Sequence, residues 1–277
     1  MPADFSRHSV AAAELFFPEG LRWRDGSLWF SDVFGGTVSC LSRSGTRVVA
    51  EVPGQPSGLG WLPDGTLLAV SMQEKALRAV AADGSTSTYA DLSEVCPQLA
   101  NDMVVDAHGR AYVGNYGYDV DAGAPVEATH LVRVNPDGAV LVEPPEVVFP
   151  NGCVIVDDGW TLLVAETFAD RVTEMSIGRD GGLFDPRPIV ELPAGSGPDG
   201  IAVTADGVIW VPCAYGERAV AVTRGGEVVD EIRIPGVGVN CCVIGDDGHT
   251  LFVAVAPLDE VEAAAHPAGR ILAVPLS

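Results

Sequence analysis

Apolar and polar positions follow one another in a unit that recurs six times along the chain. Each unit has an apolar run, a short polar turn containing glycine, and a second apolar run; the first reads LRWRDGSLWFSD and the fifth IAVTADGVIWVPC. Because glycine accepts the positive φ that a tight hairpin requires, each unit predicts a β-hairpin. The separations between successive turn glycines are 39, 44, 50, 48 and 41 residues. These glycines are Gly26, Gly65, Gly109, Gly159, Gly207 and Gly248.

A third apolar run follows every hairpin, and a fourth follows each of the first five units. The sixth unit lacks a fourth run before Ser277, whereas the segment AAELFF (residues 12–17) is left over at the other end. Placing this segment in the sixth unit removes the exposed sheet edges. The pattern therefore predicts an all-β fold, a six-bladed β-propeller with four antiparallel strands per blade and the ring closed by the N-terminal strand. We expect residues 1–277 to form a single domain.

The propeller topology gives each loop an expected position. The hairpin turns lie on one face, and the loops between second and third strands lie around the opposite mouth. The longest such loop in the first five units covers residues 115–129 and is a candidate lid. Aromatic side chains on these loops predict a pocket with apolar walls, although any one of them could instead pack its loop onto a blade. They are Phe34, Tyr116, Tyr118, Phe168 and Tyr215.

Composition and charge narrow the class of protein. With 47% hydrophobic residues among 277, the chain is not intrinsically disordered. A net charge of −22 argues against nucleic acid and anionic membranes as partners. No apolar run approaches the ~18 residues of a membrane span, and the first residues make a poor signal peptide. The six cysteines form no C-x-x-C pair and lie in apolar runs, which indicates reduced, buried thiols. We expect a cytoplasmic location.

Polar residues occupy equivalent positions at the start of each hairpin. Glu19 stands seven residues before its turn glycine, and the other five units carry a polar residue eight before theirs. We expect these side chains to converge where the blades meet. Hard divalent cations such as Ca²⁺, Mg²⁺ or Mn²⁺ prefer such oxygen ligands. For any one position, ordinary turn chemistry is the simpler explanation, but it does not require a common offset in six units. The set is Glu19, Ser57, Asn101, Asn151, Asp199 and Asn240.

Four segments carry a family resemblance: FPEGLRW, ANDMVVDAHGRAYVGN, FPNGCVIVDDGWTLLVAET and GPDGIAVTADGVIWV. Over roughly residues 14–256 the chain resembles the SMP-30/gluconolactonase/LRE family of six-bladed propellers. The resemblance implies that Glu19, Asn151 and Asp199 bind one divalent metal, Ca²⁺ in the first place, with Mg²⁺, Mn²⁺, Zn²⁺ or Fe²⁺ as alternatives. It also implies that Asn101 lies beside metal and substrate and that Asp199 is the general base.

The chain departs from the family pattern at two positions. Gluconolactonases of the family usually have Arg two residues before the ND asparagine, where it meets a polyhydroxylated sugar; this chain has Leu99. The family's VADT sequence reads VAET here, with Glu166. Together with Tyr116, Tyr118 and Phe168, Leu99 predicts a substrate less polar than a sugar lactone.

These features favour a metal-dependent hydrolase, most simply a lactonase that opens a relatively apolar ring. The alternatives are a phosphotriesterase resembling diisopropyl-fluorophosphatase, and a non-catalytic scaffold stabilised by the ion. His130 borders a mouth loop and is a candidate acid, base or substrate contact. The sequence has no G-x-S-x-G elbow, phosphate-binding glycine loop or zinc signature. The expected partner is a small ester or lactone; the oligomeric state is left open.

Overall fold

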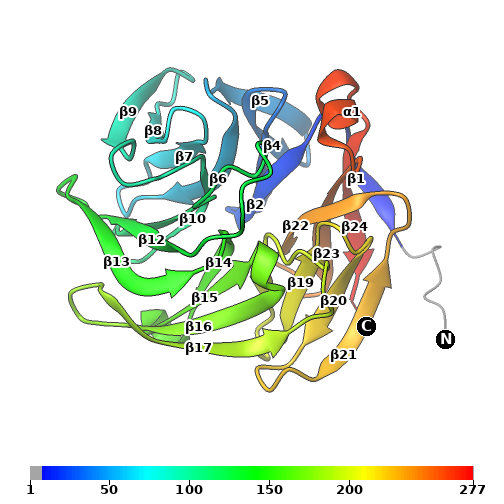
Figure 1. Cartoon of the computed structure of the whole chain (residues 1–277). Coiled ribbons are helices and arrows are strands. Elements are labelled where there is room, and N and C mark those ends of the chain that lie inside the picture. Colours follow the sequence, from blue (N-terminus) through cyan, green and yellow to red (C-terminus); the bar gives the residue numbers. More distant parts are fainter. Residues whose placement is uncertain (1–7, 277) are drawn as a thin grey trace.

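Six four-stranded antiparallel sheets are arranged as blades around a ring in the computed structural model, which describes residues 8–276 (Figure 1). In the first five blades the four strands are consecutive in sequence, because short turns join antiparallel neighbours. The six-bladed propeller predicted from the repeats is confirmed.

The strand bounds follow the repeat closely. Blade one contains β2 (Pro18–Arg24), β3 (Ser27–Asp32), β4 (Thr37–Ser42) and β5 (Gly45–Glu51). Blade two contains β6 (Pro56–Trp61), β7 (Leu67–Ser71), β8 (Ala76–Val80) and β9 (Thr86–Asp91). Blade three contains β10 (Ala100–Val105), β11 (Ala111–Asn115), β12 (Thr129–Val134) and β13 (Val140–Val147). Blade four contains β14 (Pro150–Val156), β15 (Thr161–Glu166), β16 (Arg171–Ile177) and β17 (Leu183–Glu191). Blade five contains β18 (Ala202–Val203), β19 (Ile209–Cys213), β20 (Arg218–Val222) and β21 (Val228–Arg233).

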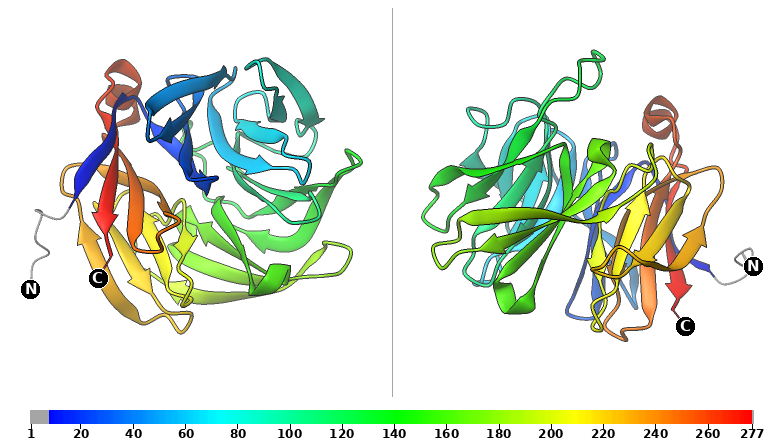
Figure 2. Two further views of the ribbon diagram at one scale, coloured as in Figure 1. Left: turned by 180° about the vertical axis from the view of Figure 1, so that it is seen from behind. Right: turned by 60° about the horizontal axis from the view of Figure 1, so that its bottom comes forward.

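The sixth blade joins the two ends of the chain. Its sheet has the order β1 (Ser9–Leu15), β24 (Gly269–Pro275), β23 (Thr250–Ala256), β22 (Gly238–Ile244). β1, in blue, lies antiparallel beside β24, in red, in both Figure 1 and Figure 2. The expected closure of the ring is therefore confirmed, although the closing strand begins and ends earlier than residues 12–17. Phe17 lies beyond its end, where its backbone N–H donates to Asp32 Oδ1 at 2.8 Å.

The hydrophobic core lies between neighbouring blades. Leu28 and Phe30 of blade one, for example, pack with Ala254 and Ile271 of blade six. All six cysteines lie within the described residues, and all are buried and free, as the sequence predicted.

Helical structure is sparse. The short turns η2 (Asp157–Gly159) and η3 (Thr167–Ala169) belong to blade four, and α1 (Glu260–Ala265) lies in the loop before β24. The side chain of Asp259 caps α1 by accepting from the backbone N–H groups of Val261 and Glu262. Within residues 8–276 no helix has the length and apolar character needed to cross a membrane.

Candidate metal centre and substrate pocket

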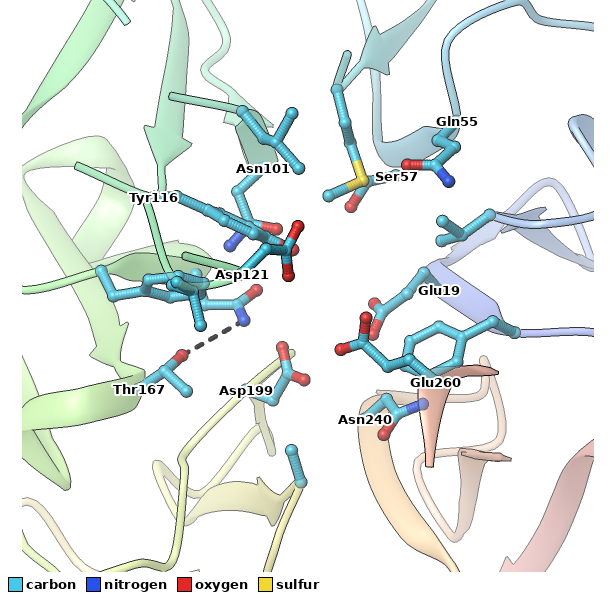
Figure 3. Close-up of a pocket in the computed structure, with 18 of the residues that line it drawn as sticks. Glu19, Gln55, Ser57, Asn101, Tyr116, Asp121, Thr167, Asp199, Asn240 and Glu260 are labelled. Atoms are coloured by element: carbon cyan, nitrogen blue, oxygen red, sulfur yellow. Dashed lines mark hydrogen bonds between the residues drawn. The ribbon is translucent and has the colours of Figure 1, made fainter. Parts of the chain in front are cut away.

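The six polar residues at equivalent repeat positions line one cavity of about 740 Å³ (Figure 3). Five come from the first strands of their blades, and Asp199 lies just before β18. All six are at least nine-tenths buried. The common offset from the hairpin glycine thus brings them together. We call them the ring residues: Glu19, Ser57, Asn101, Asn151, Asp199 and Asn240.

Irregular strand pairing turns these side chains out of the sheets. In blades one to four and six, the register between first and second strands shifts at or beside the ring residue, as between Glu19 and Arg22. In blade five the inner segment makes only isolated bridges at Pro198 and Gly200 before β18 begins. A β-bulge bends a strand and re-aims the side chain at the bulge. No residue type in the repeat predicts this bulge.

Glycines next to the ring residues allow neighbouring blades to approach closely. A Cβ on Gly152 would lie 2.5 Å from the Asp199 carbonyl oxygen, and one on Gly200 would lie 2.4 Å from Cys241 Sγ. Gly200 also donates its N–H to the Asn240 carbonyl at 2.8 Å and accepts from the Cys242 N–H at 2.9 Å. The backbone that carries Asp199 is therefore tied to blade six.

Glu19 and Asp199 are two buried carboxylates in one cavity. Burial first, and then the charge of Asp102, raise the pKa of Glu19 to about 8; the Gly20 N–H, which donates at 3.0 Å, and Arg22 oppose this. Burial first, and then the charge of Glu19, hold the pKa of Asp199 well above its usual range. In the absence of a cation, the pocket thus favours protonated forms of both groups.

Hydrogen bonds orient the amide side chains of the ring. Asn151 donates through Nδ2 to Thr167 Oγ1 at 3.3 Å (the dashed line in Figure 3), and Thr167 Oγ1 donates to the Pro198 carbonyl at 3.0 Å. This pairing leaves Asn151 Oδ1 as the free acceptor. Asn101 Nδ2 makes only a long bond, 3.4 Å, to the Pro150 carbonyl. Asn240 Nδ2 is buried without a partner.

The donor chemistry of the ring fits a hard divalent cation. Asp199 Oδ1 is buried and has no hydrogen-bond partner. Glu19 supplies a second carboxylate, and Asn151 supplies a neutral oxygen. Residues 8–276 contain no group of three His, Cys, Asp or Glu side chains arranged for a metal, so a cation here would depend on amide oxygen as well as carboxylates.

An aromatic wall covers one side of the cavity. The ring centroids of Tyr116 and Phe149 are 4.2 Å apart, those of Phe149 and Phe168 are 4.8 Å apart, and those of Phe168 and Tyr215 are 6.1 Å apart. Tyr118 packs against both phenylalanines. All five aromatic residues predicted from the mouth loops line the cavity: Tyr116, Tyr118, Phe168 and Tyr215 belong to this wall, and Phe34 packs against Phe17 elsewhere in the lining. Phe149, which lies between β13 and β14, was not anticipated because the predicted wall included only residues of the mouth loops.

Leu99 also lines the cavity, as the sequence analysis expected. Its carbonyl accepts the Tyr116 N–H at 2.9 Å, which ties the segment before β10 to the start of the lid loop. The neighbouring Gln98 and two further amide side chains, Gln55 and Gln73, line the cavity too. They supply polar groups that the sequence analysis did not consider.

Two residues singled out from the sequence lie away from the cavity. His130 is not in its lining: on β12 it pairs with Glu146 of the outer strand β13, and its Nδ1 lies 3.2 Å from the Pro145 carbonyl oxygen. His130 does border the mouth loop, as expected, but its side chain is turned towards β13 because bordering a loop does not determine which way a strand residue points. Its role as acid, base or substrate contact stays a prediction. Glu166 is fully buried and accepts from Arg171 and from the Val148 N–H, so it secures blade four.

Three acidic residues that were not predicted from the sequence line the cavity, Asp119, Asp121 and Glu260, and the last two point into it. Asp121 comes from the loop between β11 and β12, and Glu260 is the first residue of α1 (Figure 3). Neither has an equivalent in the other repeats, so the repeat pattern gave no signal for them. An ion pair between two inner strands was also not predicted. Arg22 of β2 donates through Nη2 to Oδ1 of the buried Asp102 of β10 at 2.7 Å.

Comparison with known proteins shows to which family the chain is similar. The family model described as the SMP-30/gluconolactonase/LRE-like region matches residues 17–257. Regucalcin of Danio rerio is 25% identical over 246 residues, which cover 84% of this chain and 80% of that protein. Regucalcin of Xenopus laevis is 27% identical over 242 residues, with the same shares.

Solved structures show the same fold. A gluconolactonase from Xanthomonas campestris superposes with a TM-score of 0.78 at 21% identity, covering 98% of this chain and 90% of that one. A regucalcin from Agrobacterium tumefaciens, described as a calcium-binding protein, superposes with a TM-score of 0.79 at 20% identity, covering 96% and 93%.

Proposed function

The chain belongs to the SMP-30/gluconolactonase/LRE-like family, and on this premise we propose that it is a divalent-metal-dependent lactonase acting in the cavity lined by the ring residues. The observation that carries the proposal is the pairing of two buried carboxylates, Glu19 and Asp199, with the free oxygen of Asn151. Asp199 Oδ1 has no protein partner, so it is available to a cation or to water. Names of relatives that include gluconolactonase and a calcium-binding regucalcin support this reading.

The reaction follows from the chemistry of these side chains. Glu19, Asn151 and Asp199 would hold the cation, which when bound polarises the lactone carbonyl and stabilises the charge developing on its oxygen. Asp199 accepts a proton from the attacking water. Asn101, whose Nδ2 has only a long bond to Pro150, turns to donate to a lactone oxygen and fixes the ring. The ring ester opens by cleavage of one C–O bond, and no second substrate besides water is needed.

The aromatic wall and Leu99 favour a relatively apolar ring over a sugar lactone. Five aromatic side chains offer large apolar contact, and Leu99 stands where related gluconolactonases have arginine. Ca²⁺ is the first expected metal because all the candidate donors are oxygens; Mg²⁺, Mn²⁺, Zn²⁺ and Fe²⁺ are the alternatives to compare.

A pH-stat assay tests the function directly. The purified protein is assayed on a panel of alkyl, aryl and sugar lactones and on a paraoxon-type phosphotriester, after EDTA treatment and after Ca²⁺ is restored. We expect lactone hydrolysis that EDTA abolishes and Ca²⁺ recovers. Turnover of the phosphotriester alone would assign the phosphotriesterase function instead. Metal binding with no turnover of any ester would leave the scaffold function.

A further inference from the structure

The charged side chains that line the cavity are all acidic. Among residues 8–276, five carboxylates belong to the lining and no Lys, Arg or His does. The charges of Glu19 and Asp199 would be offset by a bound divalent ion. Within the described part of the chain no basic side chain of the lining offsets Asp119, Asp121 and Glu260, so these three add acidic groups beyond those that would hold a metal.

Asp121 and Glu260 face the cavity from separate elements. Asp121 belongs to the lid loop between β11 and β12, whereas Glu260 begins α1 (Figure 3). Partial desolvation first, and then the charges of Asp121 and Asp259, raise the pKa of the Glu260 carboxyl. Two carboxylates that point into one cavity, whose lining within residues 8–276 contains no Lys, Arg or His, create a place where a positive charge is stabilised.

The aromatic wall adjoins this acidic mouth. After burial, the charge of Glu260 is the largest influence that raises the pKa of Tyr116, and it also acts on Tyr215. Glu260, Tyr116 and Tyr215 line the same cavity. Carboxylates beside aromatic faces stabilise a cation that carries an apolar surface, such as an alkylated ammonium group, by charge and by cation–π attraction.

We propose that the cavity selects lactones that bear a cationic ammonium group, with Asp121 and Glu260 recognising the charge and Tyr116 and Tyr215 contacting its alkyl surface. This substrate class rests on the proposed lactonase function. Asn240 Nδ2, buried without a partner beside Asp199 in the ring, adds a free donor for the ester end of the same molecule. Anionic lactones are repelled by the same mouth.

Three γ-butyrolactones with one ring and different side chains test the selection. Each carries, on the ring carbon next to the ring oxygen, a 2-(trimethylammonio)ethyl, a 3,3-dimethylbutyl or a 2-carboxyethyl group. The first two have nearly the same shape, so their ratio of kcat/KM reports the positive charge. We expect the cationic lactone to exceed its neutral counterpart by about tenfold at low salt, with a smaller ratio at high salt. Equal kcat/KM values for the two would overturn the proposal while leaving the lactonase function intact.

Variants that remove one carboxylate each test whether Asp121 and Glu260 recognise the ammonium group. Glu260→Gln and Asp121→Asn should each reduce the cationic-to-neutral ratio of kcat/KM to about a third. Glu262→Gln, two residues along the same helix and outside the cavity, is the matched control and should keep the wild-type ratio. A ratio that is the same in all variants would contradict the assignment to Asp121 and Glu260.

Calorimetric binding of the three corresponding lactams separates this proposal from the lactonase function, because lactams resist turnover. Preferential binding of the cationic lactam, with no hydrolysis of any lactone, would sustain the charge selection and refute the proposed reaction. The contrary result would be equal affinities for the three lactams, together with a second Ca²⁺ equivalent that binds the wild type but not a variant carrying both Asp121→Asn and Glu260→Gln. That result would overturn the proposal and assign Asp121 and Glu260 to a second cation.

Discussion

At the scale of single residues, Asp199 has two proposed roles, because it is both a candidate metal ligand and the candidate general base. Asp199→Asn keeps the shape of the side chain and removes its charge and its proton acceptor. We expect kcat to fall by about a hundredfold or more. In EDTA the unfolding temperature should be unchanged or higher, because burial raises the pKa of Asp199 and the neutral amide of the variant has no charge to bury. Wild-type kcat in the pure, metal-loaded variant would disprove the role.

Glu19 should make the stability of the metal-free protein depend on pH. Its pKa rises from 4.5 to about 8 on folding, so between these values the folded protein retains a proton that the unfolded chain has released. The free energy of unfolding in EDTA should therefore fall as pH rises through this window. Urea unfolding at several pH values measures the slope, which Glu19→Gln should reduce. A slope that is equally steep in Glu19→Gln would show that Glu19 titrates normally.

Leu99 bears on the choice between sugar and apolar lactones. If two substrate hydroxyls are left unpaired against Leu99, at about 1 kcal/mol or more each, kcat/KM falls by roughly thirtyfold. We expect glucono-δ-lactone to be a poorer substrate than an alkyl-substituted lactone of the same ring size. A preference for the sugar lactone would indicate that Gln98, Gln73 or Gln55 supplies the missing donors.

At the scale of strands and loops, close contacts between blades hold the ring residues in place. Gly152→Ala introduces a Cβ that would lie 2.5 Å from the Asp199 carbonyl oxygen, so the backbone beside Asp199 must move. We expect a lower unfolding temperature and weaker Ca²⁺ binding by calorimetry. Gly225→Ala is the control, because its Cβ would meet nothing closer than 3.6 Å. If both variants bind Ca²⁺ like wild type, the close contact does not position the site.

Most of the fold and part of the candidate site could be predicted from the sequence. The physical reasons differ for the two. Hairpin turns and apolar strands are local features, and their repetition predicted the blades and the convergence of residues such as Asn151 and Asp199. Asp121 and Glu260 lie on loops that have no counterpart in other blades, so only the folded chain brings them together. The orientation of His130 depends on pairing between β12 and β13, and the Arg22–Asp102 pair depends on contacts between blades one and three.

At the scale of the whole molecule, a cation bound by the ring residues would link blades that are far apart in sequence. If Ca²⁺ binds only the folded protein, a concentration a hundred times Kd adds about 2.7 kcal/mol to the free energy of unfolding. That corresponds to a rise of about 5 °C in Tm for a chain of this size. Thermal unfolding with Ca²⁺ and with EDTA measures the difference. Glu19→Gln should show a smaller rise and Glu262→Gln the full one; equal rises would mean that Ca²⁺ stabilises the protein elsewhere.

The pairing of β1 with β24 also affects how the protein is made on the ribosome. β1 is synthesised about 250 residues before its partner β24. At a translation rate of about 5–20 residues per second, β1 has no partner strand for roughly 12–50 s. An unpaired strand is a template for wrong pairing with other nascent chains. β1 contains three consecutive alanines, Ala11–Ala13, which have low strand propensity. A weak strand-former at this position limits premature pairing until the correct neighbour has been synthesised.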